Sequence, residues 1–121
     1  MRVVAQRVGG AFLNRERHHE VNNTSTDGRR LYLHGHTIMR WKDDELWFNM
    51  SGWASVTTRS RINDVCELAG LGRPLSQHRH VQYAHDVEIP DIYGWYPADR
   101  HAFTVKLVED ALDVPTPLKG E

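Results

Sequence analysis

The chain has 121 residues, enough for a core of its own, and we expect residues 1–121 to form a single domain. A hydrophobic content of 40% and a charged content of 26% argue against disorder, and a net charge of −1 gives no general attraction to nucleic acid. No apolar run suits a membrane span or signal peptide, and the single cysteine, Cys66, excludes an internal disulfide, so the expected location is a reducing cytoplasm.

The charge is distributed unevenly along the chain. Residues 1–42 hold eight Arg and Lys residues against three acids, whereas residues 43–121 hold seven against thirteen. This asymmetry predicts either an electropositive face for a polar partner or two halves that neutralise each other. We favour the second interpretation, because one small domain has few ways to keep its halves apart.

The first elements are a short helix and a hairpin. Residues 2–17 have apolar positions at helical spacing with a Gly-Gly interruption, which predicts a short helical element ending near Asn14. Residues 18–23 are polar and predict a loop. Asp27-Gly28 then predicts a hairpin between strands at 22–26 and 30–34, because Asp-Gly tolerates the positive φ of a type I′ turn.

The following segments extend the hairpin into an antiparallel meander. Gly35-His36 predicts a turn or bulge, residues 37–41 and 46–50 predict strands, and residues 42–45 predict a charged turn. Alternation along the strands places apolar side chains on one face. These side chains are Leu31, Leu33, Leu46, Phe48 and Met50.

One main helix is predicted at about residues 58–69. Its apolar residues at helical spacing are Ile62, Val65, Leu68 and Ala69. Thr57 or Thr58 is the expected N-cap, and Gly70 and Gly72 supply the end. The predicted fold class is therefore α+β: an antiparallel sheet of four to six strands with this helix packed on its apolar face.

The remaining segments are less regular. Residues 80–89 alternate and predict a strand, and residues 90–99 predict a turn-rich aromatic loop. Residues 102–107 alternate and predict a final strand, although the apolar residues between 107 and 112 also fit helical spacing. Two prolines and a glycine predict a frayed tail at residues 113–121.

The predicted helix start is the main candidate site. Its residues, proposed for binding an anion or a partner, are Thr57, Thr58, Arg59, Arg61 and Trp53. Free N–H groups and hydroxyls suit an anion, and the arginines oppose the helix dipole in a way that a bound phosphate would relieve. The alternative is structural: threonine caps the helix, and the arginines pair with acids. The candidate acids are Asp43, Asp44, Glu45 and Asp64.

The histidines form two His-x-His pairs, His34 with His36 and His78 with His80. Such a pair on one strand places both imidazoles on one face, which suits zinc or iron. Gly35 indicates a turn within the first pair, and no carboxylate or cysteine falls at a matching spacing. We therefore expect half-exposed polar histidines, no metal site and no cofactor.

No established catalytic motif is present: there is no G-x-S-x-G, H-E-x-x-H, phosphate loop or C-x-x-C. His85 with Asp86, and His101 near Asp99, suit an acid–base pair on paper, but almost any chain of this size offers one. We therefore do not assign an enzyme.

Aromatic residues are frequent. They are Trp41, Trp47, Trp53, Trp95, Tyr32, Tyr83, Tyr93 and Tyr96. Alternation places Tyr32, His34 and Trp47 opposite the helix-covered face of the sheet. Exposed aromatics beside arginines suit stacking on single-stranded bases or anchoring a protein interface. The third possibility is a second buried layer formed by the C-terminal half.

Residues 22–63 resemble a group of small uncharacterised proteins of bacteriophages and prophages. The shared pattern is Asn-Thr, then Leu-x-Leu-His-Gly-x-x-Ile, then Gly-Trp-x-(Ser/Thr)-x-Thr-Thr-Arg-x-Arg-(Leu/Ile)-Asn. It stands here as Asn23-Thr24, residues 31–38 and residues 52–63, and His36 occupies a position where Asn is more usual. The resemblance implies a small cytoplasmic phage protein and assigns no substrate or functional residue.

These observations favour a non-enzymatic phage accessory protein, acting in the host cytoplasm away from membranes. Its expected partner is a host or phage macromolecule, a protein in preference to nucleic acid because the chain is not basic overall. The alternative is a nucleic-acid-binding protein that uses the Thr-Thr-Arg-x-Arg helix start and the basic N-terminal third. The third hypothesis is a metal-dependent enzyme built on the His-x-His pairs.

Overall fold

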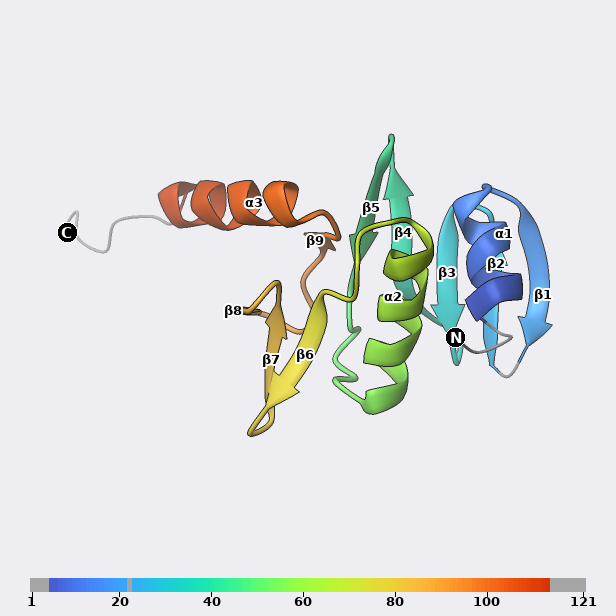
Figure 1. The fold of residues 1–121 in the computed structure, drawn as a ribbon, viewed down its shortest axis with the longest axis horizontal. Helices are drawn as coiled ribbons and strands as arrows, with labels where there is room; N and C mark the ends of the chain where they lie inside the picture. Colours follow the sequence, from blue (N-terminus) through green and yellow to red (C-terminus); the bar gives the residue numbers. More distant parts are fainter. Residues whose placement is uncertain (1–4, 22, 114–121) are drawn as a thin grey trace.

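The computed structural model describes residues 5–21 and 23–113 (Figure 1). The elements in chain order are η1 (Ala5–Gly9), α1 (Gly10–Leu13), β1 (Arg17–Val21), β2 (Thr24–Asp27), β3 (Arg30–Leu33), β4 (His36–Lys42), β5 (Glu45–Phe48), α2 (Val56–Leu68), β6 (Leu75–His78), β7 (Val81–Ala84), β8 (Val87–Glu88), β9 (Tyr96–Pro97) and α3 (Arg100–Asp113). The strands form antiparallel sheets, which confirms the α+β class. The short N-terminal helical element ends at Leu13, beside the predicted end at Asn14.

The main sheet has six strands in the order β1-β2-β3-β4-β5-β9, and each neighbouring pair is antiparallel. The predicted meander is therefore confirmed. The predicted loop at residues 18–23 is wrong, because residues 17–21 form β1 at the edge of this sheet. This mostly polar segment forms a strand because its backbone pairs with β2. Its sequence has no alternation of apolar residues from which a strand could be predicted.

The hairpin between β2 and β3 is confirmed, but its turn is not type I′. Thr26 pairs with Leu31, and of the loop residues Gly28 and Arg29 only Gly28 has positive φ, at 94°. A type I′ turn needs positive φ at both central residues, so the predicted turn type is wrong. Asp27 stabilises the turn from outside the loop: its carboxylate accepts the N–H of Arg29 at 2.9 Å and of Arg30 at 2.8 Å.

Figure 1 shows α1 and α2 on the same side of the main sheet, where they cover its apolar face. The core between these helices and the main sheet includes Phe12, Leu31, Phe48, Ile62 and Val65, all of them buried. Their burial confirms the predicted packing of the main helix through its first apolar turns. Leu68 is an exception, because its side chain is 40% exposed.

The main helix begins at Val56, and its N-cap is Ser55 rather than Thr57 or Thr58. The Ser55 hydroxyl accepts the N–H of Thr58 at 3.1 Å. The predicted cap is wrong because several adjacent residues carry a capping hydroxyl, and the backbone turns into the helix at the first of them.

A second, three-stranded sheet replaces the single strand predicted at residues 80–89. Its order is β6-β7-β8, and its two turns are Arg79-His80 and His85-Asp86. All four turn residues have positive φ, between 50° and 68°. Turns of this kind usually contain Gly or Asn, so neither turn is visible in the sequence pattern.

The strand predicted at residues 102–107 is wrong, because this segment lies within α3. The helical spacing of the apolar residues predicts the structure correctly here, and the alternation over residues 102–107 does not. The Asp99 carboxylate accepts the N–H of Ala102 at 3.0 Å at the helix start, and the Phe103 ring packs on Tyr96 with ring centres 5.8 Å apart. From there α3 extends away from both sheets (Figure 1). Most of the predicted tail, residues 114–121, lies outside the described residues.

Candidate functional site

The structure does not gather the predicted helix-start residues into one pocket. Arg61 is buried, and its Nε donates to the Thr24 hydroxyl on β2 at 3.1 Å. Thr58 is also buried, and its hydroxyl lies 3.1 Å from that of Ser55. Thr57 is half-buried in the first helical turn.

Arg59 is directed away from Arg61, toward the second sheet. Its Nη1 donates to the Ala54 carbonyl and to the side-chain oxygens of Gln77 and Gln82, each at 3.0 Å. These contacts join the helix start to the β6–β7 hairpin, so Arg59 helps to hold the two elements together. A binding role for the helix start stays a prediction.

Three of the four acids named as alternative partners have other partners. Arg73 pairs with Asp64 at 2.7 Å, and Arg15 lies 3.4 Å from Asp44. Glu45 accepts the indole N–H of Trp47 at 3.2 Å.

The His-x-His pairs lie in different parts of the fold. His34 and His36 flank the Trp53 ring, with ring centres 6.0 and 5.5 Å away. His78 and His80 lie at the β6–β7 turn of the second sheet. Within the described ranges, no three His, Cys, Asp or Glu side chains converge to hold a metal.

The acid–base pairs considered from sequence do not form. The His85 ring contacts the Ala98 carbonyl through Nε2 at 2.9 Å, and Asp86 lies 3.9 Å from Arg100. Asp99 is engaged at the start of α3. His85 and Asp99 thus contact the segment around the start of α3, and the Asp86–Arg100 pair is exposed.

The face of the main sheet opposite α1 and α2 carries polar and aromatic side chains. Alternation from the buried positions assigns to this face Ser25, Asp27, Arg30, Tyr32, Thr37, Arg40, Lys42, Glu45 and Trp47. Tyr32 and Trp47 therefore lie where the sequence predicted. His34 instead occupies a turn with φ of 51°, and Trp41 lies on the helix side, where its indole donates to the Phe12 carbonyl at 2.9 Å.

Strand register aligns three of these side chains in one row. Arg30 pairs with Arg40, Arg40 pairs with Trp47, and Trp47 pairs with Pro97 on β9. Neighbouring strands lie about 4.8 Å apart, so the row presents two guanidinium groups and an indole at successive steps across the sheet. We call Arg30, Arg40 and Trp47 the cross-strand row.

Arg40 is held by an aromatic ring from a distant loop. Its guanidinium carbon lies 4.2 Å from the centre of the Trp95 ring. Asn49 fixes that loop by donating to the Tyr93 carbonyl at 2.9 Å. The Arg40 Nε is buried and has no hydrogen-bond partner among the described residues. A buried donor without an acceptor costs about 1–3 kcal/mol.

A groove of about 310 Å³ adjoins the row where β3 begins and β4 ends. Four cations line it: Arg29, Arg30, Arg40 and Lys42. Among its described lining residues the one acid is Asp43, whose backbone carbonyl, and not its carboxylate, accepts from Arg15 at 2.7 Å. The groove thus concentrates half of the cations in the basic N-terminal third on one surface.

Asp27 is the acid next to Arg30 on this face. Burial alone would raise the pKa of its carboxyl, but hydrogen bonds from the N–H groups of Arg30 and Arg29, and from the Tyr32 hydroxyl, lower it overall. The Tyr32 hydroxyl lies 3.0 Å from the carboxylate. Asp27 therefore stays ionised, and Glu45 pairs with Lys42 in the strand register, so this face carries three cations, Arg30, Arg40 and Lys42, against two acids.

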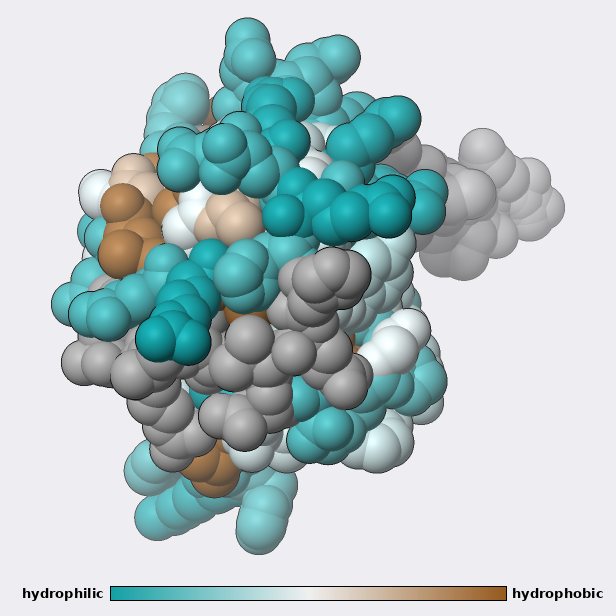
Figure 2. Space-filling view, turned by 90° about the vertical axis from the view of Figure 1, so that its right-hand side faces the viewer, coloured by the Kyte–Doolittle hydropathy of each residue, from teal (hydrophilic) through white to brown (hydrophobic). Residues whose placement is uncertain are grey.

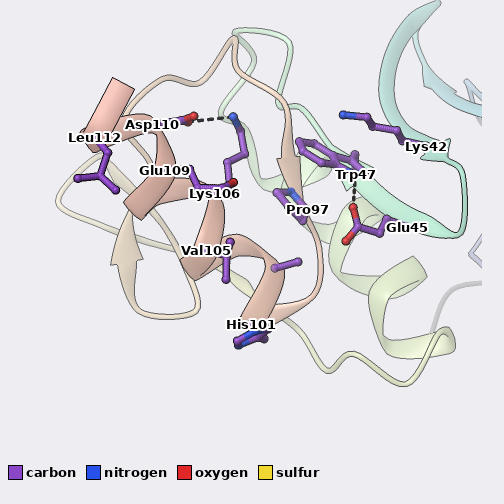
Figure 3. Close-up of a pocket in the computed structure, with 11 residues that line it drawn as sticks. Lys42, Glu45, Trp47, Pro97, His101, Val105, Lys106, Glu109, Asp110 and Leu112 are labelled. Atoms are coloured by element: carbon purple, nitrogen blue, oxygen red, sulfur yellow. Dashed lines mark hydrogen bonds and ion pairs between the residues drawn. The ribbon is translucent and has the colours of Figure 1, made fainter. Parts of the chain in front are cut away.

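A second groove, of about 770 Å³, lies between α3 and the β5–β9 edge (Figure 3). Trp47 and Pro97 form one wall, and α3 forms the other (Figure 3). The ammonium groups of Lys42 and Lys106 lie 4.8 and 5.9 Å from the centre of the Trp47 ring. The indole thus has a lysine from β4 and a lysine from α3 beside it.

Figure 2 shows the end of the molecule formed by β1. Hydrophilic side chains predominate there among the coloured residues, and apolar ones form small separate spots. Among the coloured residues of this view no broad apolar surface is seen, of the kind that large protein interfaces bury.

The sequence pattern does not predict that Arg30, Arg40, Lys42 and Trp95 belong to a common surface. The sequence shows the alternation within each strand but not the register between strands. The register is what aligns Arg30, Arg40 and Trp47. Nothing in the sequence connects Trp95 to Arg40.

No described helix is both long and apolar enough to cross a membrane. The chain has no significant match among curated proteins or solved structures. The family model described as Kyanoviridae Gp96 protein matches residues 1–99, so the match ends where α3 begins. It confirms the resemblance to bacteriophage proteins without testing the individual motifs. The chain belongs to the Kyanoviridae Gp96 protein family.

Proposed function

We propose that this phage protein binds single-stranded nucleic acid on the open face of its main sheet, without catalysis, in the host cytoplasm. The cross-strand row carries the proposal, because it places two guanidinium groups beside an indole at the spacing of neighbouring strands. Guanidinium groups bind phosphates in bidentate geometry, and indole rings stack on bases.

The groove of four cations supports a polyanionic partner. Each phosphate neutralised by Arg or Lys releases condensed counterions, which is the main driving force of nucleic-acid binding. The overall charge of −1 does not oppose this, since the cations are gathered on one surface. The overall charge alone favours a protein partner over nucleic acid, and the local arrangement of the cations favours the reverse order.

A single strand fits this surface better than a duplex. Aromatic rings on a sheet stack on unpaired bases, whereas bases inside a duplex do not present their faces. Tyr32 and Trp47 are half-buried on the open face, with Arg30 and Arg40 beside them. Bases on the rings and phosphates on the guanidinium groups account for both kinds of side chain.

A protein partner is the second candidate, and it rests on a different surface. Trp53 and Tyr93 are 54% and 70% exposed. The Tyr93 ring lies close over Gly52, whose φ is 76°, so the two aromatic side chains flank one turn. Exposed Trp and Tyr side chains are frequent anchors of protein interfaces.

Anisotropy of a labelled 12-nucleotide single-stranded DNA tests the proposal. The variant Arg30→Gln with Arg40→Gln removes two cations of the row. The control, Arg79→Gln with Arg100→Gln, removes the same charge from exposed positions away from it. We expect the row variant to bind at least tenfold more weakly in low salt and the control to bind nearly normally. The dependence of log K on log salt should fall by about 1.4, from about 0.7 for each lost phosphate contact.

Two results would contradict the proposal. One is absence of binding by the natural protein in low salt. The other is equal weakening by the row variant and the control, which would mean that net charge alone attracts the DNA. Binding of a duplex more tightly than the single strand of the same sequence would point to phosphate contacts without base stacking.

A further inference from the structure

Helix α3 is attached to the fold by one side and carries apolar residues on the other. Phe103 is buried, and Leu107 is partly buried against the core. A helix turns by about 100° per residue, so Val105, Val108 and Leu112 lie away from this packed side. They are 39%, 55% and 79% exposed, and the exposure rises along the helix as it leaves both sheets (Figure 1). We call these three side chains the α3 stripe.

The stripe has the spacing of a seam between two helices. Val105 and Val108 are three positions apart, Leu112 follows after four, and His101 precedes Val105 by four. These are the intervals of the a and d positions of a heptad, which face the partner helix in a coiled coil. The order four, three, four is the same in both directions along the chain. An antiparallel copy of α3 therefore places Val105 opposite Val108, and His101 opposite Leu112.

The charges of α3 favour an antiparallel over a parallel neighbour. Arg100 and His101 begin the helix, and Glu109 and Asp110 lie toward its end, all four exposed. Each pair has the sign that the dipole of its own helix disfavours, because the N-terminus is partly positive and the C-terminus partly negative. Asp110 pairs with Lys106 at 2.9 Å, and no described side chain pairs with Glu109. An antiparallel neighbour brings its basic start to this acidic half, whereas a parallel one brings like charges together.

We propose that the α3 stripe is a homodimer interface, in which the α3 helices of two copies of this chain pack antiparallel. The twofold axis passes between Val105 and Val108, so the same surface of each copy meets itself. The stripe shares no residue with the cross-strand row, and the proposal does not depend on nucleic-acid binding. A helix of 14 residues offers less area than the roughly 1,200 Å² of a standard interface, so the dimer is in exchange with the monomer at micromolar concentrations.

Sedimentation velocity over a series of protein concentrations tests the interface. Val108→Asp places a charge in the centre of the stripe, and we expect it to raise the dissociation constant of the dimer at least tenfold, by roughly the effect of losing one central contact. Leu112→Asp should act in the same direction. Both side chains are exposed in the monomer, so both variants should keep the circular dichroism of the natural protein. Val56→Asp, an exposed valine at the first residue of α2, is the matched control and should dimerise normally.

Disulfide trapping tests the orientation of the two helices. His101 and Leu112 are about 16 Å apart along one helix, too far for a disulfide within the chain. The variants His101→Cys and Leu112→Cys should form a covalent dimer under mild oxidation only when the two are mixed, because the antiparallel register brings each position to the other. The natural Cys66 is buried and takes no part.

Three results would overturn the proposal. A natural protein that stays monomeric at every concentration would leave the stripe to a different macromolecule or to residues 114–121. A dimer that Val108→Asp leaves intact, or that Val56→Asp weakens equally, would lie on another surface. Covalent dimers formed by His101→Cys alone and by Leu112→Cys alone would show parallel helices and contradict the antiparallel register.

Discussion

Asn63 and Leu75 hold each other by two hydrogen bonds. The Asn63 side-chain amide donates to the Leu75 carbonyl at 2.9 Å, and the Leu75 N–H donates to the Asn63 side-chain oxygen at 2.8 Å. Both residues are buried. This pair fastens α2 to the first strand of the second sheet, so the helix that covers the main sheet also positions β6.

The variant Asn63→Leu should therefore be strongly destabilised. It keeps the volume of the side chain but leaves the buried N–H and carbonyl of Leu75 without partners, at a cost of about 2–4 kcal/mol in the free energy of unfolding. Chemical denaturation measures it. Ser60→Ala, on the same helix, is the control and should change little; an Asn63→Leu variant as stable as this control would show that the pair is dispensable.

The arginines of the helix start should behave as structural residues. Arg61→Ala removes a buried guanidinium that bonds Thr24, so we expect a loss of about 2 kcal/mol or more, and Arg59→Ala should cost less because Arg59 is only half-buried. Single-strand binding by the folded variants should stay normal. Normal stability together with lost binding would instead establish the helix start as the binding site.

Cys66 should be inert in the folded protein. Burial raises the pKa of its thiol to about 12, with the Arg73 charge opposing the shift only weakly. The folded thiol stays neutral while the unfolded thiol ionises, so its contribution to stability is complete below pH ~8.5 and is lost as the pH rises toward 12. We expect no reaction with a thiol reagent at pH 8 until the chain unfolds.

Cys66→Ala is the control for that pH dependence, since it lacks the thiol but keeps the other groups that titrate in alkali. Its stability should fall less steeply above pH ~9 than that of the natural protein. Rapid labelling of Cys66 under native conditions would contradict its burial.

Substitutions in the β6–β7 turn should increase the stability of the protein. Arg79 and His80 both have positive φ, at 50° and 68°, which costs residues with a Cβ more than Gly or Asn. Replacing them by Asn and Gly should raise the free energy of unfolding by about 1 kcal/mol, seen as a higher Tm in thermal denaturation. An unchanged or lower Tm would show that the natural residues make compensating contacts.

The sequence predicts the meander and the main helix because apolar alternation and helical spacing both point to one buried face. It misses β1, whose sequence is mostly polar and whose position comes from backbone pairing with β2. It misses the second sheet for another reason: the turns at Arg79-His80 and His85-Asp86 lack the glycines that announce tight turns. In residues 102–107, alternation and helical spacing compete, and packing of Phe103 on Tyr96 decides for the helix.

The candidate site was partly accessible from sequence. Alternation alone assigns Tyr32 and Trp47 to the open face. The alignment of Arg30 and Arg40 with Trp47 depends on the register of three strands, including the irregularity between Leu31 and Tyr32. Arg59 and Arg61 oppose the helix dipole at the helix start, and hydrogen bonds to Gln82 and Thr24 account for their placement there.

The most direct test of the central claim is an NMR titration of the protein with single-stranded DNA, following the arginine Nε–H and tryptophan indole N–H signals. The account predicts that Arg40, Trp47 and Trp95 shift together in proportion to bound DNA, while Trp53 and Arg79 stay in place. Shifts confined to Trp53 and Arg59, with Arg40 and Trp47 unmoved, would contradict the sheet face and return the site to the helix start.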